Sequence, residues 1–218
     1  MKKRIIIAYF GTKDEKAMSQ LSSFIKELQA ESSVSCGSIS LMHKDVANQL
    51  VFPADEKILM LPLLIQRGGT YEKLLSCGFE TAPPLLCRTE DIRECASVIN
   101  RTLEKKTDHN YILIAHGDEM RRIEEYGTLQ NCLRNDVIIT ALKGKDRYTD
   151  VFPSCRNITL IPFLLTCGHH AAHEINTGCR EHFMKRGYSV TTVESGILSL
   201  FPGIRGIFIR HMKELEKE

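Results

Sequence analysis

Hydrophobic residues along the chain follow two alternating patterns. Short runs rich in Ile, Leu and Val predict buried strands, and the segments between them repeat apolar residues at helical spacing. The expected strands are 4–10, 34–41, 57–64, 84–87, 111–115, 137–142, 158–165 and 189–193. The clearest helical stripes lie within 21–28, 92–103 and 204–215. Strands without internal alternation, each followed by a helix, are typical of parallel sheets covered on both faces, so the pattern predicts an α/β fold.

Similar segments recur in the first and second halves of the chain. Residues 58–68 read ILMLPLLIQRG and residues 158–168 read ITLIPFLLTCG, with Ile, Pro, Leu and Gly at matching places. A second pair of similar segments is IIIAYFG at 5–11 and ILIAHG at 112–117, and each is an apolar run that ends in Gly. The chain therefore has the sequence pattern of a duplicated unit.

The duplication predicts two similar α/β domains, residues 1–108 and 109–218, with their boundary in the charged stretch 104–109. With 218 residues and 43% hydrophobic content, the chain can bury two cores of roughly a hundred residues each. Phe10 stands in the first copy where His116 stands in the second. We therefore expect the chemistry to be concentrated in the second half.

Charge and composition exclude several classes of function. The 29 basic and 27 acidic residues give a net charge of +2 and form no long basic run, which argues against nucleic acid as a partner. The first apolar run is too short for the core of a signal peptide, and no segment approaches the roughly 18 apolar residues of a membrane span. A soluble, cytoplasmic protein without membrane contact is expected. The eight cysteines occur singly, with no CxxC, as is usual for reduced thiols.

A cluster of three histidines and a glutamate follows one of the predicted strands. Residues 158–174 read ITLIPFLLTCGHHAAHE, so a buried strand runs through one Gly into the cluster. Histidine is the commonest metal ligand in proteins and exchanges protons near neutral pH. If a helix begins near His169, residues four apart share a face, which pairs His169 with His173 and His170 with Glu174.

The position of each histidine relative to the strands separates functional candidates from others. Ligands of parallel sheets bind beyond the carboxyl ends of the strands, where both His116 and His170 lie. These two are expected to act in the chemistry. A functional role and a solvated helix start remain equal alternatives for His169, His173 and Glu174.

The remaining histidines and the cysteine beside the cluster have a plainer interpretation. Isolated histidines are more often surface or capping residues than ligands, and this is expected of His43, His109, His182 and His211. Cys167 could supply a soft ligand, but a small buried thiol is the simpler expectation.

Five short motifs occur in a fixed order. They are Phe-Gly-Thr at 10–12, Gly-x-x-Tyr-Glu-Lys at 68–73, strand-His-Gly at 116–117, Pro followed by Gly-x-His-Ala at 162–171, and Pro-x-Ile-Arg at 202–205. Together they resemble the anaerobic cobalt chelatases of cobalamin biosynthesis, which are small class II tetrapyrrole chelatases related to ferrochelatase. The resemblance covers almost the whole chain. It implies two similar α/β domains facing across a cleft that holds the macrocycle, and ATP-independent insertion of a divalent metal into sirohydrochlorin, with no nucleotide.

The resemblance also implies roles for individual residues. His116 and His170 would bind the metal and accept pyrrole protons, and Glu174 is a further candidate ligand. The tetrapyrrole-binding residues would include Phe10, Gly11, Thr12, Arg67, Gly68 and Lys143. The cationic side chains among them would pair with acidic side chains of the substrate.

Two positions depart from the family pattern. Lys143, in the segment Ala-Leu-Lys-Gly at 141–144, stands where the family has a glutamate ligand, and Leu64 stands where many relatives carry a histidine. An ammonium group beside a divalent ion repels it. Lys143 must therefore point away, be neutralised, or bind an acidic group of the substrate.

Three functions are compatible with these residues. The first is insertion of Co²⁺ into sirohydrochlorin, and the second is a chelatase for another metal, such as Fe²⁺ or Ni²⁺. The third is a non-catalytic relative that binds a tetrapyrrole or a metal, in which loss of the carboxylate removed turnover. The sequence leaves open whether the protein forms a homo-oligomer.

Overall fold

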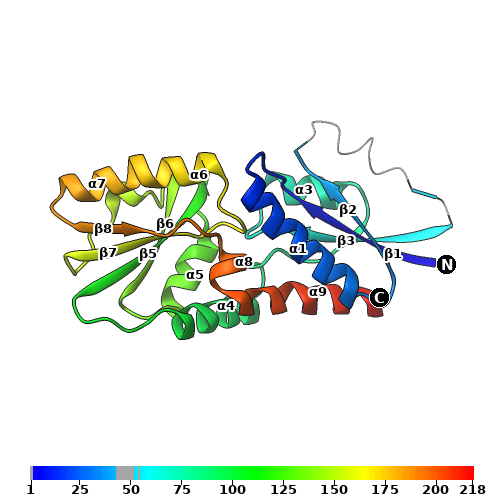
Figure 1. Ribbon diagram of the computed structural model, residues 1–218. Coiled ribbons are helices and arrows are strands. Elements are labelled where there is room, and N and C mark those ends of the chain that lie inside the picture. Colours follow the sequence, from blue (N-terminus) through cyan, green and yellow to red (C-terminus); the bar gives the residue numbers. More distant parts are fainter. Residues whose placement is uncertain (1, 43–51, 54) are drawn as a thin grey trace.

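The computed structural model describes residues 2–42, 52–53 and 55–218, apart from the side chains of His169 and His170. Two four-stranded sheets dominate it (Figure 1), and every pairing between their strands is parallel. The first sheet has the order β2-β1-β3-β4, with β1 at Lys2–Tyr9, β2 at Ser35–Ser40, β3 at Glu56–Leu63 and β4 at Glu80–Thr81. The second has the equivalent order β6-β5-β7-β8, with β5 at His109–Asp118, β6 at Val137–Gly144, β7 at Asn157–Pro162 and β8 at Ser189–Thr192. The expected α/β fold with two similar sheets is confirmed.

Helices cover both faces of each sheet (Figure 1). They are α1 Glu15–Glu31, α3 Gly69–Ser76, α4 Thr89–Thr102, α5 Glu124–Cys132, α6 His169–Glu174, α7 Arg180–Lys185, α8 Ile197–Leu200 and α9 Arg205–Lys217. Short 3₁₀ turns lie at Tyr148–Asp150 and Pro202–Ile204, and a π-helical turn at Ile175–Cys179 joins α6 to α7. The histidine cluster therefore opens a helix, as predicted, and a π turn of the kind often found at functional sites follows it directly.

The two sheets share one hydrophobic core. Ile5 and Ile7 of β1 pack in the same buried cluster as Leu113 of β5 and Phe208 of α9. The opposite faces of the sheets have separate, smaller clusters, under α3 in the first half and under the π turn and α7 in the second. Because the central core joins residues from both halves, burial of apolar surface holds the two sheets in one body.

The C-terminal helix α9 packs against the first half of the chain. It contacts α1, α4 and β3, and Phe24 of α1 meets Phe208 edge-on with ring centroids 6.0 Å apart. Glu216 accepts hydrogen bonds from the Ser33 amide at 2.8 Å and from the hydroxyls of Ser32 and Ser33 at 3.0 and 2.8 Å. The strands divide at residue 108 but α9 crosses back, and the boundary between two domains at 108/109 stays a prediction.

His211 is fully buried, so the expectation of a surface or capping residue was wrong for this histidine. Its Nε2 lies 2.8 Å from Oδ2 of Asp91, a fully buried carboxylate of α4 that also pairs with Arg210 at 2.6 Å. Burial of an unpaired carboxylate costs much free energy, and the ion pair and hydrogen bond of Asp91 reduce this cost. The apolar helical stripe predicted at 204–215 did include His211. His43, which was also expected at the surface, lies outside the described residues.

The registers of the two sheets match at a proline. Ala8 pairs with Pro62 in the first sheet, and Ile114 pairs with Pro162 in the second. Counting forward from these pairs makes Phe10 equivalent to His116, as the duplication predicted.

The strand expected at 84–87 is not formed. The fourth strand is the two-residue β4, and the chain then turns into α4. Leu85 and Leu86 are fully buried, which explains their strand-like pattern, and their amides donate to the carbonyls of Leu64 and Ile65 at 2.9 and 2.8 Å. A proline pair at 83–84 stops a longer strand because proline lacks the amide hydrogen that a ladder needs.

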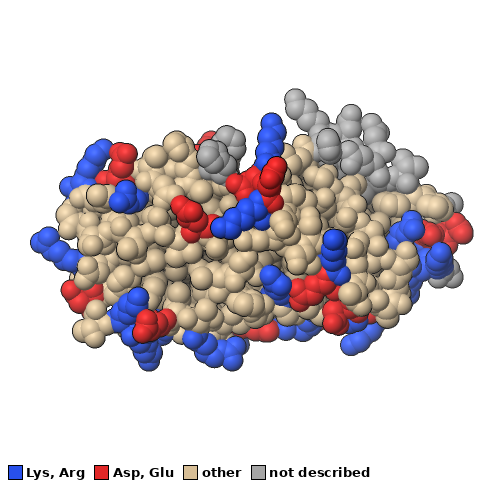
Figure 2. All heavy atoms as spheres, in the orientation of Figure 1, with Lys and Arg blue, Asp and Glu red and all other residues tan. Residues whose placement is uncertain are grey.

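Acidic and basic side chains are interspersed on the face of the molecule in Figure 2, in keeping with their even spread along the sequence. Among the described residues, none of the helices is both long and apolar enough to cross a membrane.

Candidate metal and tetrapyrrole site

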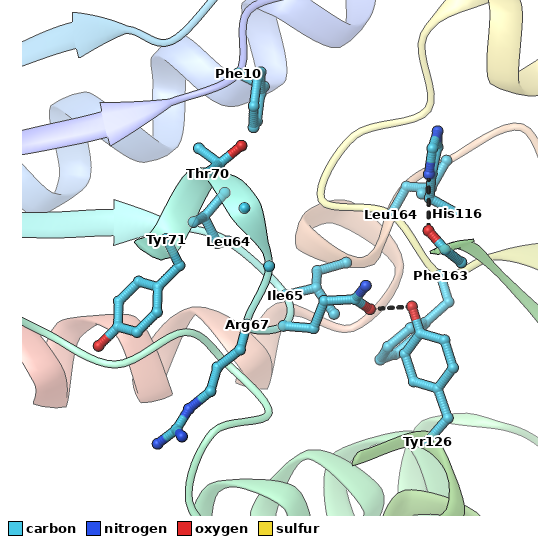
Figure 3. Close-up of a pocket in the computed structure, with 14 residues that line it drawn as sticks. Phe10, Leu64, Ile65, Arg67, Thr70, Tyr71, His116, Tyr126, Phe163 and Leu164 are labelled. Carbon is cyan, nitrogen blue, oxygen red and sulfur yellow. Dashed lines mark hydrogen bonds between the residues drawn. The ribbon is translucent and has the colours of Figure 1, made fainter. Parts of the chain in front are cut away.

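A cavity of about 450 Å³ lies where the strands of the two sheets end (Figure 3). The first half contributes Phe10 and the segment from Leu64 to Tyr71, and the second half contributes His116, Gly117, Tyr126, Phe163 and Leu164. Its position beyond the carboxyl ends of β1, β3, β5 and β7 is where parallel sheets bind ligands. His116, Phe10 and Leu64 all line this one cavity.

His116 presents one free ring nitrogen at this cavity. Its side chain is exposed, and its Nδ1 lies 3.1 Å from the carbonyl oxygen of Gly117. Because a carbonyl can only accept, this contact favours the neutral tautomer in which Nδ1 carries the proton and Nε2 keeps its lone pair. A neutral imidazole held in this way can bind a metal ion or take up a proton.

Gly117 fixes the chain direction immediately after His116. Its φ of +79° lies in the left-handed region, and an added Cβ would overlap the carbonyl oxygen of Lys143 on the neighbouring strand. Only glycine adopts this conformation in so little space. The His-Gly pair seen in the sequence therefore has a structural reason, which is to let the last residues of β5 pair closely with β6 directly after the histidine that lines the cavity.

The walls of the cavity are mostly apolar. Phe10, which is 48% exposed, and Leu64 belong to the first half, whereas Phe163 and Leu164 belong to the second. In Figure 3, Phe10 and His116 come from different halves and stand on opposite sides of the opening. Such walls suit a flat, largely apolar ligand that is sandwiched between the halves.

Two hydrogen bonds join the halves beneath the cavity. The Tyr126 hydroxyl of α5 donates to Oε1 of Gln66, and the Arg121 guanidinium donates to the backbone carbonyl of Arg67. Burial raises the pKa of Tyr126, so its hydroxyl stays protonated as a donor. Sequence reasoning missed Tyr126 and Gln66, because a single aromatic residue on an amphipathic helix carries no signal of its partner in another element.

The Phe-Gly-Thr motif divides between the cavity and a structural contact. Phe10 lines the cavity, but Gly11 and Thr12 do not. The Thr12 hydroxyl accepts from the amide of Asp14 at 3.1 Å, and an added Cβ on Gly168 would lie 2.6 Å from Thr12 Oγ1. The loop after β1 thus packs directly on the loop that leads into α6.

The histidine cluster begins at this contact. His169 and His170 form the first turn of α6, and their side chains lie outside the described part of the structure. His173 and Glu174 are exposed. Among the residues that the structure describes, no group of three or more His, Cys, Asp or Glu is arranged to hold a metal ion. The roles of His170 and Glu174 as ligands therefore stay predictions.

Cys167, just before the cluster, is buried as expected. Burial, with a smaller contribution from the charge of Glu194, raises the pKa of its thiol to about 11. The thiol of the metal-free protein is therefore neutral near pH 7, as is usual for a buried cysteine.

Lys143 lies beside the His116 segment without lining the cavity. It pairs with Gly117 in the β5–β6 register, and its ammonium group lies 3.5 Å from a carboxylate oxygen of Glu119. The side chain is 42% exposed. Its charge is thus partly neutralised by an acidic neighbour, one of the three outcomes expected from the sequence.

Comparison with known families identifies the fold and its relatives. The family model described as cobalt chelatase (CbiK) matches residues 42–217 of the 218. The chain belongs to the cobalt chelatase family. It is therefore a member of the metal chelatase enzymes, as its motifs implied. A comparison with curated protein sequences gave no match.

Solved structures of similar fold include sirohydrochlorin chelatases. SirB from Bacillus subtilis subspecies spizizenii in complex with cobalt has a TM-score of 0.68 at 16% identity, covering 100% of this chain and 96% of that chain. SirB from Bacillus subtilis with Fe³⁺ has the same TM-score and identity, covering 99% and 96%. CbiX, described as the terminal enzyme for biosynthesis of siroheme in denitrifying bacteria, has a TM-score of 0.60 at 16% identity, covering 98% and 99%. At these identities the similarity concerns the fold.

Proposed function

We propose that this member of the cobalt chelatase family inserts Co²⁺ into sirohydrochlorin, without ATP, as a step of anaerobic cobalamin biosynthesis. The observation that carries the proposal is the position of His116, which presents a free imidazole nitrogen at an apolar cavity built from both halves. A macrocycle is apolar over its two faces and basic at its centre, so it needs apolar walls with a ligand at one side.

The reaction requires little of the protein beyond ligands and bases. Two pyrrole protons must leave the macrocycle as the divalent ion enters, so the overall change is one M²⁺ bound and two H⁺ released. Neutral imidazoles can both hold the ion weakly enough to give it up and accept the protons. We assign these tasks to His116 and His170, with Glu174 as a third ligand, and assign Phe10 and Gly68 to contact with the macrocycle.

The metal is proposed from the family rather than from the site. Imidazole ligands suit Co²⁺, Fe²⁺ and Ni²⁺ alike, and the similar SirB structures contain cobalt in one case and Fe³⁺ in another. Co²⁺ is favoured here because the matching family model is that of cobalt chelatase.

A second function is supported by Lys143. Where the family pattern implies a carboxylate ligand, this chain has an ammonium group paired with Glu119. A protein that lacks one ligand could bind a tetrapyrrole or a metal without turnover. Such a protein would bind sirohydrochlorin but would not accelerate its metallation.

The deciding experiment follows the absorption spectrum of sirohydrochlorin after addition of Co²⁺, Fe²⁺ or Ni²⁺, with and without the protein. A faster spectral change with Co²⁺ than with the other ions supports the proposal. Preference for Fe²⁺ or Ni²⁺ would replace cobalt as the metal. Binding without acceleration by any ion would favour the non-catalytic function.

A further inference from the structure

Tyr126 stands between the two halves of the chain, close to His116. Its side chain is buried in the core that both sheets share, with 4% of its surface exposed, and it lines the cavity. It belongs to the first turn of α5, and Ile123 and Leu129 beside it are buried in the same core. Oδ2 of Asp146 accepts from the Ile123 amide at 3.2 Å and so fixes the start of this helix. The tyrosine is therefore held firmly by the second half.

The hydroxyl of Tyr126 reaches a fixed point in the first half. It donates to Oε1 of Gln66, across the cavity floor in Figure 3. The segment that carries Gln66 is itself fixed, because the carbonyls of Leu64 and Ile65 accept from the amides of residues 85 and 86 at 2.9 and 2.8 Å. The hydrogen bond therefore sets the distance between two well-anchored segments, one in each half.

The same hydroxyl oxygen is linked to the residue that follows His116. Burial has the largest effect on the pKa of Tyr126 and raises it, whereas a hydrogen bond from the backbone of Gly117 acts in the opposite sense. This second effect requires a donor, and the amide is the only backbone donor of Gly117. The carbonyl of Gly117 lies 3.1 Å from Nδ1 of His116. A continuous series of hydrogen bonds thus leads from Gln66 through Tyr126 and Gly117 to the His116 ring.

A histidine that binds a metal ion needs such support at its other nitrogen. The partner of that nitrogen fixes the tautomer and the orientation of the ring. Here the support begins in the first half, so the orientation of the His116 ring and its distance from the opposite wall at Phe10 are set together. A displacement of about 1 Å at a reacting group can slow a reaction roughly 100-fold.

We propose that Tyr126 is a positioning residue for metal insertion, which holds the peptide between His116 and Gly117 at a fixed distance from Gln66 in the opposite half. It acts through His116 and takes no part in the proton or metal transfer. The inference rests on the proposed function, since it takes His116 as the metal ligand and base.

The test combines metallation kinetics with a measurement that needs no turnover. Tyr126→Phe removes only the hydroxyl, and the contact of the Arg121 guanidinium with the Arg67 carbonyl still joins the halves. We expect kcat for insertion of Co²⁺ into sirohydrochlorin to fall about tenfold, because the ligand is misplaced, with little change in KM. Nitrogen NMR of the neutral, metal-free protein should show the His116 tautomer shifting from Nδ1–H toward Nε2–H.

Variants of Gln66 test the contact from the other side. Gln66→Met, which removes the acceptor at similar length, should produce the same tautomer shift as Tyr126→Phe. Because the two residues act through one contact, the double variant should have no lower kcat than Tyr126→Phe alone. Gln66→Glu keeps an acceptor and should retain the wild-type tautomer.

Tyr111→Phe is the matched control. Tyr111 is also buried in the shared core, with 5% of its surface exposed, and its hydroxyl donates to the Glu104 carbonyl at 2.9 Å near the opposite end of β5. This variant loses an equivalent hydroxyl and should keep the wild-type kcat and His116 tautomer. An equal loss of kcat in Tyr111→Phe and Tyr126→Phe would show a general effect on the fold and would overturn the inference.

The NMR result separates this inference from the proposed function. An unchanged His116 tautomer in both Tyr126→Phe and Gln66→Met overturns the inference, whether or not the wild type inserts metal. A shifted tautomer in both variants, with no metallation by the wild type, supports the positioning contact and overturns the proposed function.

Discussion

Phe10 and His116 occupy equivalent positions in the two sheets and line the same cavity from opposite halves. Each stands two residues beyond the strand residue that pairs with the proline of the neighbouring strand, which is Ala8 for Phe10 and Ile114 for His116. The duplicated fold thus supplies two similar strand ends, and the sequence places an aromatic ring on one and an imidazole on the other. An asymmetric site of this kind can pack one face of a flat ligand while a metal approaches from the opposite face.

His116→Ala should abolish metal insertion and leave the fold intact. The side chain is exposed at a strand end, where substitutions usually change stability by less than about 0.5 kcal/mol. The rate of sirohydrochlorin metallation and the unfolding midpoint in denaturant report the two effects. His170→Ala is expected to behave in the same way, and His173→Ala, on the same helix, serves as the control. Insertion at the wild-type rate in either of the first two variants would remove that residue from the mechanism.

Lys143→Glu should raise the affinity for Co²⁺ in the absence of macrocycle by only a few-fold. Lys143 pairs with Glu119 and does not line the cavity, so the new carboxylate would act over distance rather than as a ligand. A distant, partly exposed charge is screened by salt, and the gain should disappear at high ionic strength. Calorimetric titration at low and high salt measures it.

Lys145→Glu is the matched control for that substitution, since it reverses a neighbouring exposed charge. A large gain in Lys143→Glu that persists in high salt would show direct coordination by the new carboxylate. In that case our account of where the Lys143 side chain lies would be wrong.

Gly117→Ala should destabilise the protein by at least about 2 kcal/mol, because a residue with Cβ is strained at positive φ and would overlap the Lys143 carbonyl. Movement of the strand end would also displace His116 and slow metallation. Gly127, in α5, provides a contrast, since an added Cβ there has no neighbour within 4 Å. Gly127→Ala should raise the free energy of unfolding by roughly 0.5–1 kcal/mol. Equal unfolding midpoints for the two variants would contradict the argument.

Glu216 should contribute stability that is lost in acid. Burial alone would raise the pKa of this carboxyl, but hydrogen bonds from the amide and hydroxyl of Ser33 and the hydroxyl of Ser32 lower it below the ordinary value of 4.5. A carboxyl whose pKa is lower in the folded state stabilises the protein above its unfolded pKa and loses this effect as the pH falls through the folded pKa. Glu216→Gln should therefore cost roughly 1 kcal/mol at pH 7 and nothing once both states are protonated.

Chemical denaturation at several pH values measures this difference. Glu104→Gln, an exposed position, should give no pH-dependent change. A loss of stability in Glu216→Gln that is equally large at pH 7 and in acid would indicate altered packing of α9 rather than titration.

The fold was largely predictable because its signals are local or repeated. The similarity of 5–11 to 112–117 placed Phe10 opposite His116, and the registers of the two sheets at Pro62 and Pro162 give the same equivalence. The apolar run at 84–87 misled because Leu85 and Leu86 are buried in a turn, and burial alone does not separate a turn from a strand.

The contacts that the sequence did not predict join elements that are far apart along the chain. Tyr126 meets Gln66, and His211 meets Asp91, only after the halves have packed together. Neither member of either pair has a local pattern that indicates its partner. His116 could be predicted from the sequence because it lies near the carboxyl end of a strand, and parallel sheets bind ligands beyond these ends.

The two prolines also explain why the outer strands of the two halves end at the same level beside the cavity. The carbonyls of Met60 and Leu160 accept hydrogen bonds from Ala82 and Val193, so these residues face the outer strands β4 and β8. Two residues on, Pro62 and Pro162 face the same way but have no amide hydrogen to offer. The outer strand in each half must therefore separate from its neighbour at that level, while pairing with the inner strand continues to Leu63 in the first sheet and to Pro162 in the second. The absence of an amide hydrogen at the same place in each copy thus ends the pairing with the outer strand. A substitution that restored this hydrogen in one half would extend that sheet and narrow the opening of the cavity from one side.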